Sequence, residues 1–336
     1  MRVPLKCSQL FTVDAARALV GYPVSVKADE TTTPVDIYAI AARQAGTLSC
    51  VWGGHGLAGE TAGYNDQLEV DIAPDASTAY ATNVAAIYAG TSPTSVNTPG
   101  VKSESLCDLT SYFFCGAEML VGTYWVSVQL QNDYNLTISS DVANTRIQQV
   151  LTIAAATLRD AKPAAAWKPP ASKLPTICSS THSRATLQKI LGMTALEPTP
   201  TTSGATDAYF SAFSGAASCQ SRDDLATETG IAKVIYVDFE VLKGGAWSLQ
   251  ALVRSPHNSE YFGTYRAVKI PGTNAAVLAC SISSDCSAIV AINNNVIEID
   301  LEVPSTTKSI TNLKPPSAKR TIATVSELIR AIGTAD

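Results

Sequence analysis

The chain has 336 residues, of which 46% are hydrophobic and 16% are charged, and its formal net charge at pH 7 is -5. This composition excludes an intrinsically disordered chain, and the length allows two domains that each bury a core of their own. The small negative charge and the lack of a Lys/Arg cluster argue against nucleic acid as a partner. There is no run of 18 apolar residues, so the sequence predicts no helix that crosses a membrane.

Two helices are predicted at the start of the chain. The first runs from Thr12, a favourable N-cap, to Val20, and Gly21 follows where a left-handed C-cap residue would lie. The second begins near Pro34 and ends at Gly46. Hydrophobic periodicity then predicts the remaining elements of the first half, which are strands over 48–52 and 67–72, a helix over 75–88, strands over 117–121 and 124–130, and a helix over 142–158.

The second half of the chain repeats the first. Eight cysteines fall into two sets whose offsets are 171, 169, 173 and 171 residues, and the sets are Cys7, Cys50, Cys107 and Cys115, then Cys178, Cys219, Cys280 and Cys286. Asp36-x-Tyr38 likewise recurs as Asp207-x-Tyr209. The second copy is predicted to contain strands over 234–242, 288–292 and 296–301 and helices near 247–254 and over 318–332.

A segment rich in proline and alanine, residues 162–175, separates the copies and is typical of a semi-rigid linker. We therefore expect a first domain over 1–161 and a second over 176–336. Each is predicted to be an α+β domain in the order α-α-β-β-α-β-β-α. Strands joined by short loops should pair antiparallel, and helices should cover one face of each sheet.

An even number of cysteines in each copy indicates disulfide bonds. Neither a Cys-x-x-Cys pair nor a nearby histidine suggests a metal site, and nothing indicates a cofactor. Four cysteines allow three connectivities, and distance along the chain and symmetry favour one of them in each copy. The predicted pairs are Cys7 with Cys50, Cys107 with Cys115, Cys178 with Cys219, and Cys280 with Cys286. Disulfides persist outside the reducing cytosol, so we expect an extracytoplasmic protein.

Residues 2–9 lack the apolar core of an export signal. If the cysteines pair, we expect that an export segment precedes Met1 in the full protein and that a lipid anchor could have been lost with it.

Two motifs carry a resemblance to a known family. Residues 7–12 read Cys-Ser-Gln-Leu-Phe-Thr, the helix ends in Val20-Gly21-Tyr22-Pro23-Val24, and Cys50-Val51-Trp52 follows. In these motifs the chain resembles actinobacterial secreted cell-envelope lipoprotein domains of unknown function and, more broadly, the extracellular sensor domains of actinobacterial receptor kinases. The second copy departs from the pattern, since Ser221 stands where the first has Trp52. The resemblance implies secretion, attachment to the envelope and a binding or sensing role, and it brings no catalytic residues.

Features that only one copy carries are the candidates for a specific role. The predicted ligand-binding residues are Trp52, His55, Tyr64, Arg222, Asp223 and Asp224. The plainer interpretation is that His55 lies on a solvated glycine-rich loop, and that Asp223 and Asp224 lie on another solvated loop. With Glu228, the two aspartates could also form a cation site.

The sequence therefore favours a secreted, non-enzymatic envelope protein that binds or senses an unknown ligand or protein. A hydrolase with its site in an inter-domain cleft is the alternative from another class, since His55, His182 and His257 are the chain's only histidines and lie in no recognisable catalytic motif. A structural scaffolding protein is the third interpretation.

Overall fold

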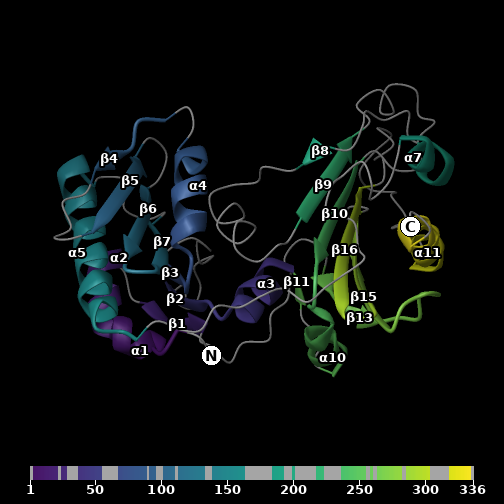
Figure 1. Cartoon of the computed structure of the whole chain (residues 1–336), viewed down its shortest axis with the longest axis horizontal. Coiled ribbons are helices and arrows are strands. Elements are labelled where there is room, and N and C mark those ends of the chain that lie inside the picture. The colour runs from purple at the N-terminus through teal and green to yellow at the C-terminus, as the bar shows by residue number, and fades with distance from the viewer. Residues whose placement is uncertain are drawn as a thin grey trace, which may run out of the picture. The chain divides into compact units, whose positions relative to one another are not determined.

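The computed structural model describes sixteen segments of the chain. These are residues 3–21, 24–28, 37–54, 67–88, 91–95, 101–109, 113–132, 138–162, 184–192, 199–200, 217–222, 236–254, 258–259, 263–281, 285–302 and 318–333. The chain forms two compact units, and each is α+β with an antiparallel sheet (Figure 1). This confirms the predicted fold class and the antiparallel pairing.

The elements follow the chain in two similar series. The first is α1 (Cys7–Leu10), α2 (Val13–Val20), β1 (Val24–Ala28), α3 (Ile37–Ala45), β2 (Leu48–Gly54), β3 (Gln67–Ala73), α4 (Ser77–Ile87), β4 (Thr94–Ser95), β5 (Lys102–Asp108), β6 (Phe113–Val121), β7 (Tyr124–Asn132) and α5 (Ser140–Arg159). The second is α7 (Arg184–Leu191), β8 (Thr199–Pro200), β9 (Ala217–Arg222), β10 (Tyr236–Leu242), α10 (Ala246–Arg254), β11 (Asn258–Ser259), β12 (Gly263–Thr264), β13 (Arg266–Ala267), β14 (Ala275–Cys280), β15 (Asp285–Ile292), β16 (Asn295–Glu302) and α11 (Ala318–Gly333).

The two large sheets have the same strand order. The first sheet runs β1-β2-β3-β7-β6-β5-β4, and the second, read in the same direction, runs β8-β9-β10-β16-β15-β14-β13. The registers also correspond, because Cys50 lies opposite Val70 on β3 as Cys219 lies opposite Phe239 on β10. The repeated cysteines therefore mark equivalent places in two copies of one topology.

In the first unit, one face of the sheet packs against α1, α2 and α5, and the other face packs against α4. The first core joins Leu19 of α2 and Ile147 of α5 to the alternate strand residues Val70 and Val128. On the opposite face, the ring of Tyr80 on α4 meets Trp125 edge to face, with 5.7 Å between the ring centroids.

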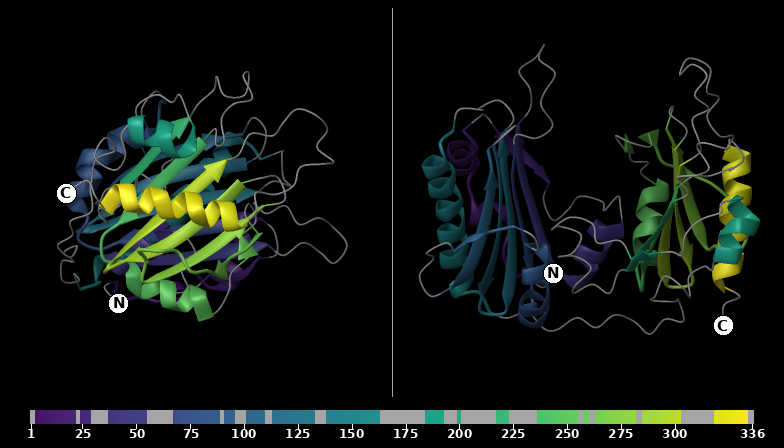
Figure 2. Two further views of the ribbon diagram at one scale, coloured as in Figure 1. Left: turned by 90° about the vertical axis from the view of Figure 1, so that its right-hand side faces the viewer. Right: turned by 90° about the horizontal axis from the view of Figure 1, so that it is seen from above.

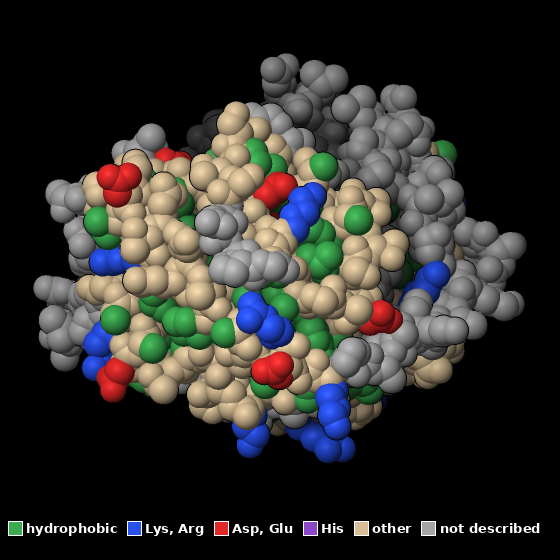
Figure 3. All heavy atoms as spheres, turned by 60° about the vertical axis from the view of Figure 1, so that its left-hand side comes forward, with side chains coloured by type: hydrophobic (Ala, Val, Ile, Leu, Met, Phe, Trp, Pro, Cys, Tyr) green, Lys and Arg blue, Asp and Glu red, His purple; other side chains and the backbone are tan. Residues whose placement is uncertain are grey.

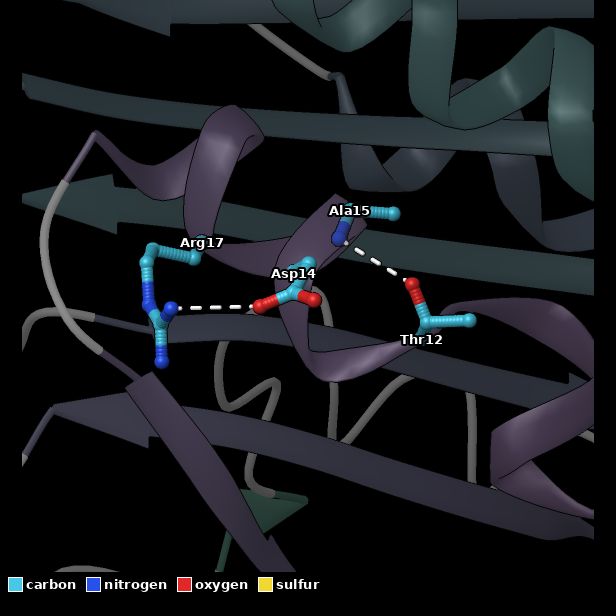
Figure 4. A network of polar contacts seen from close by, with 4 residues as sticks. All are labelled: Thr12, Asp14, Ala15 and Arg17. Carbon is cyan, nitrogen blue, oxygen red and sulfur yellow. Dashed lines mark hydrogen bonds and ion pairs between the residues drawn. The ribbon is translucent and has the colours of Figure 1, made fainter.

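Local hydrogen bonds define the ends of α2 as the sequence predicts (Figure 4). The Thr12 hydroxyl accepts a hydrogen bond from the backbone N–H of Ala15 at 3.2 Å, and Asp14 forms an ion pair with Arg17 at 3.1 Å. Gly21 ends the helix with φ of +81°, a left-handed conformation that side chains disfavour. The predicted N-cap and C-cap are both confirmed.

In the second unit, α7 and α11 lie on one side of the sheet and α10 lies on the other (Figure 2). Helices therefore cover both faces of each sheet, and the prediction of one covered face was wrong. The reason is visible on β15, where Ala288 and Val290 face one core while Ile289 and Ala291 face the other. A strand that is apolar on both faces needs cover on both.

Helix α3 differs from the expected domain division. Its sequence lies in the first copy, between β1 and β2, yet Thr33–Ala41 belong to the second unit. Met1–Thr32 and Ala42–Lys168 belong to the first unit, so the division falls within α3, between Ala41 and Ala42. Ile37 and Ile40 pack in a core with residues of the second sheet.

Three of the four predicted disulfides are confirmed, namely Cys7–Cys50, Cys107–Cys115 and Cys280–Cys286. Cys219 is also disulfide-bonded, and Cys178, its predicted partner, lies outside the described residues. Cys107–Cys115 and Cys280–Cys286 each join directly opposed residues of two neighbouring strands.

The predicted element order lacks several strands, among them β1, β5 and β14. On β5, the inward-facing residues Ser103 and Ser105 are buried although they are polar. Hydrophobic alternation therefore gives no signal for this strand, and only its pairing with β6 establishes it.

Candidate functional site

One face of the second sheet carries an unusual number of carboxylates. On β10, Asp238 and Glu240 alternate with the core residues Val237, Phe239 and Val241. Because successive side chains of a strand point to opposite faces, both carboxylates lie on the face that bears α10. Their neighbours in register on β16 and β15 complete the set on this face, which is Asp238, Glu240, Asp285, Glu298, Asp300 and Glu302.

This face is divided into an apolar part and an acidic part. The apolar part includes Leu242, Val277 and Ile289, which pack with α10 and with residues of α3. We define the acidic half as Asp238, Asp285, Asp300 and Glu302 together with their neighbours Tyr236, Ser218 and Ser287, and the pair of Glu240 and Glu298 lies between it and the apolar part. The four carboxylate residues of the acidic half are partly exposed.

Asp238 and Asp300 lie directly opposite each other on neighbouring strands. Ser218 donates a hydrogen bond to one carboxylate oxygen of Asp238 at 3.1 Å, and the Tyr236 hydroxyl donates to the other at 3.2 Å. These two donors favour the ionised form of Asp238. Two like charges at a cross-strand pair repel each other, so the pair is costly when both are ionised.

The ionised form of Asp300 is the one that is disfavoured. The pKa of Asp300 is raised to about 7, chiefly by burial of its carboxyl and also by the negative charges of Asp238 and Asp285, while the nearby Ser287 hydroxyl acts in the opposite direction. The Oδ1 atom of Asp300 is buried and has no hydrogen-bond partner in the described structure. The acidic half thus contains a carboxyl that titrates near neutral pH and has an unused acceptor.

The first sheet also carries carboxylates on its equivalent face, and three of them lie in one row across the strands. Successive cross-strand partners from β2 to β5 are Ser49, Asp71, Ser127, Glu118 and Glu104. Asp71 is 3% exposed and Glu118 is 2% exposed, so the centre of this row is closed to solvent.

Glu118 is held by donors from the adjacent strand. Trp125 donates its indole N–H to one oxygen of Glu118, and the Ser127 hydroxyl donates to the other at 2.8 Å. Burial nevertheless raises the pKa of Glu118 to about 8, because the two hydrogen bonds compensate only in part for lost hydration. Burial also raises the pKa of Asp71, and the charges of Glu69 and Glu118 raise it further.

Helix α4 covers the part of this row that lies on β5, β6 and β7. The hydroxyl of Tyr88 donates to the backbone carbonyl of Glu104 at 3.1 Å, and Tyr80 packs on Trp125. The row of the first sheet is therefore part of the interior. The acidic half of the second sheet remains partly exposed, and we take it as the candidate functional site. Charged side chains on the face of the molecule in Figure 3, by contrast, are scattered among polar and apolar ones.

The residues that the sequence predicts as a ligand site are not brought together by the described structure. Trp52 lies on β2 with its side chain fully buried, and its ring meets Phe11 edge to face at 5.4 Å between centroids. Arg222 is the last residue of β9 and its backbone lies opposite Tyr236, beside the acidic half. The other predicted residues, His55, Tyr64, Asp223 and Asp224, lie outside the described residues. A role for these six residues in binding stays a prediction.

Sequence reasoning missed the acidic half although the signal is present. The apolar alternation of 234–242 predicts a strand, and the intervening residues of that strand are Asp238 and Glu240. The same pattern occurs at Glu298, Asp300 and Glu302. Carboxylates at every second position of a strand must share a face, so the two patterns together could have indicated an acidic surface.

Comparisons with known proteins identify no relative. No family model, no curated protein and no solved structure matches this chain.

Within the described part of the chain, no three Asp, Glu, His or Cys side chains are grouped as metal ligands. Among the described helices, none combines the length and apolar character that crossing a bilayer requires.

Proposed function

We propose that the protein is a secreted, non-enzymatic binding protein of the cell envelope, and that the acidic half binds a ligand with more than one positive charge. The observation that carries the proposal is the opposed pair of Asp238 and Asp300, in which one buried oxygen of Asp300 lacks a partner. A cation at this pair would supply that partner and would relieve the repulsion between the two carboxylates.

The spacing of the carboxylates favours a ligand with several amines. Alternate residues of a strand are about 7 Å apart, and residues opposite each other on neighbouring strands are about 5 Å apart. The residues Asp300 and Glu302 are therefore about 7 Å apart along β16, and Asp238 and Asp300 are about 5 Å apart across the strands. A linear or branched polyamine or a basic peptide can contact several such positions at once.

Secretion is supported by the disulfides. Three pairs are formed between described cysteines, and Cys219 is bonded as well. Such bonds are stable outside the reducing cytosol. The two rival interpretations, a hydrolase and a scaffolding protein, stay predictions.

The test is isothermal titration calorimetry of the whole chain with spermine as the probe. We expect Asp300→Asn to weaken binding about tenfold, because a hydrogen bond to a charged group is worth about 1.5–3 kcal/mol. The matched control is Glu327→Gln, which removes the same charge from an exposed position on α11, a helix of the opposite face. Equal affinities of the two variants for spermine would refute the assignment of the site.

The pH dependence gives a second readout. Since the pKa of Asp300 is raised to about 7, its ionised form accumulates as the pH rises through neutrality. We therefore expect spermine to bind more tightly at pH 8 than at pH 6 and expect the Asn variant to lose most of this difference. A wild-type affinity that is unchanged between the two values would contradict the role of Asp300.

A further inference from the structure

Helix α3 comes from the first copy of the repeat but completes a core of the second unit. Three of its residues, Ile37, Ile40 and Ala41, are fully buried. The core that contains them is otherwise made by residues of the second copy, which are Leu242, Leu249, Leu252, Tyr265, Val277, Ala279, Ile289, Ala291 and Val296. An Ile-x-x-Ile spacing puts both isoleucines on one face of the helix, which is how helices bind apolar grooves.

The helix is also held at its first turn. The backbone N–H of Ile37, the first residue of α3, donates to the Oε2 atom of Glu298 at 3.2 Å. The first N–H groups of a helix have no partner inside the helix, and a negative charge at this end is favourable. Glu298 thus accepts a hydrogen bond from the first turn of a helix that lies 261 residues earlier in the chain.

Glu298 is fixed for this purpose by a chain of hydrogen bonds. Its other oxygen accepts from the Ser287 hydroxyl at 3.1 Å, and Ser287 accepts in turn from the Tyr265 hydroxyl at 2.9 Å. All three residues are buried. Without the N–H of Ile37 this buried carboxylate would lose a hydrogen bond, which is costly.

The second unit also makes room for the side chain of Ile40. A Cβ atom built on Gly245, which precedes α10, would lie 3.1 Å from the Cγ2 atom of Ile40 and 3.0 Å from the Cδ2 atom of Leu242. Both distances are tighter than ordinary contacts between side chains. The absence of a side chain at Gly245 is therefore matched to the position of Ile40.

We infer that the α10 face of the second sheet is a docking surface for a helix, and that its occupant is α3 of the first copy. The second unit therefore completes its core with Ile37, Ile40 and Ala41 of the first copy, while the rest of α3, from Ala42, belongs to the first unit. A second unit without α3 would expose the apolar part of its sheet and would leave Glu298 without one of its donors.

The test is hydrogen–deuterium exchange of the whole chain with peptide-level detection, comparing Ile40→Ala with wild type. We expect the amides of β15 and β16 to exchange about 30-fold faster, the equivalent of roughly 2 kcal/mol, while β6 and β7 keep their protection. The matched control is Leu19→Ala on α2, whose side chain lies in the first core, and it should show the reverse pattern.

If Ile40→Ala fails to fold, Ile40→Val gives the same test with a smaller change. It removes one buried methyl group and should accelerate exchange of β15 and β16 about threefold to tenfold. Either variant refutes the inference if β6 and β7 are deprotected as much as β15 and β16, because α3 would then stabilise the unit in which its sequence lies.

Discussion

The two large sheets have equivalent strands in the same order, yet they differ in the face that bears α4 in the first unit and α10 in the second. The carboxylates at the centre of this face are buried in the first sheet and partly exposed in the second. In the first sheet, Asp71 and Glu118 are buried, and α4 packs on β6, the strand that carries Glu118. In the second sheet, Asp238 and Asp300 are partly exposed, while the apolar part of the face is covered by α10 and α3. The two copies therefore share a topology without sharing the side chains of this face. The reason is that the topology depends on the cores on the opposite faces of the sheets.

Equivalent positions show how the difference arose. Ser127 is the partner of Asp71 in the first sheet, and Glu298 is the partner of Glu240 at the same place in the second. At the next position along the strand pair, Gln129 of the first sheet corresponds to Asp300. These differences, Ser127 against Glu298 and Gln129 against Asp300, do not disturb the strands, since the side chains lie on the face away from α5 and α11.

The largest expected effect concerns Trp52, whose equivalent in the second sheet is Ser221. We expect Trp52→Ala to lower the free energy of unfolding by about 3–5 kcal/mol, because the change leaves a cavity beside Phe11 in the first core. Urea denaturation would measure this loss. A loss below about 1 kcal/mol would mean that Trp52 is not a packing residue and would strengthen its predicted role as a ligand contact.

The disulfides should differ according to the length of chain that each one closes. Replacing both Cys7 and Cys50 with alanine should cost about 4 kcal/mol, since their separation is 43 residues. Replacing both Cys280 and Cys286, whose separation is 6 residues, should cost only about 2 kcal/mol. The two double variants control for each other in thermal denaturation, and equal losses would contradict the chain-entropy explanation.

The buried carboxyl of the first sheet should make stability depend on pH. The folded pKa of Glu118 is about 8 against an ordinary value of 4.5, so its ionised form is disfavoured by folding. The free energy of unfolding should then fall as the pH rises from about 4.5 to about 8, by about 1.4 kcal/mol for each unit of the shift. Glu118→Gln should remove this part of the slope when urea denaturation is compared at pH 5 and pH 8.5.

Exposed Glu327 provides the control for this experiment, because Glu327→Gln removes the same charge from a solvated position. The part of the slope that Glu118 causes should remain in this variant. If the Glu118 and Glu327 variants have the same pH dependence, burial does not raise the pKa of Glu118 as described.

The smallest expected effect belongs to Ser221. Its hydroxyl is buried, with the side chain 3% exposed, and has no hydrogen-bond partner within the described residues. Ser221→Ala should therefore raise the free energy of unfolding, by up to about 1 kcal/mol, because an unsatisfied polar group is removed from the interior. Thermal denaturation would detect the change, and a loss of stability would show that the hydroxyl has a partner after all.

Several features could be predicted because they depend on neighbours in sequence. The caps of α2 at Thr12 and Gly21 and the positive φ of 54° at Asn293 in the turn between β15 and β16 are of this kind. The disulfides Cys7–Cys50 and Cys107–Cys115 were predictable for another reason, since the second copy restricts the choice of pairing. The candidate site was not predicted, since it depends on which carboxylates of separate strands share a register.

The sequence by itself determined the duplication, the α+β class, the antiparallel pairing and three of the disulfides, because periodicity and cysteine spacing are repeated along the chain. Only the tertiary structure decided which faces are covered, where the carboxylates gather and which unit buries Ile37 and Ile40 of α3. The physical reason is that an amphipathic helix such as α3 carries an apolar stripe but no label for the surface that will bury it. Ile37 and Ile40 would suit many apolar grooves, and the packing around Gly245 and the carboxylate of Glu298 select this one.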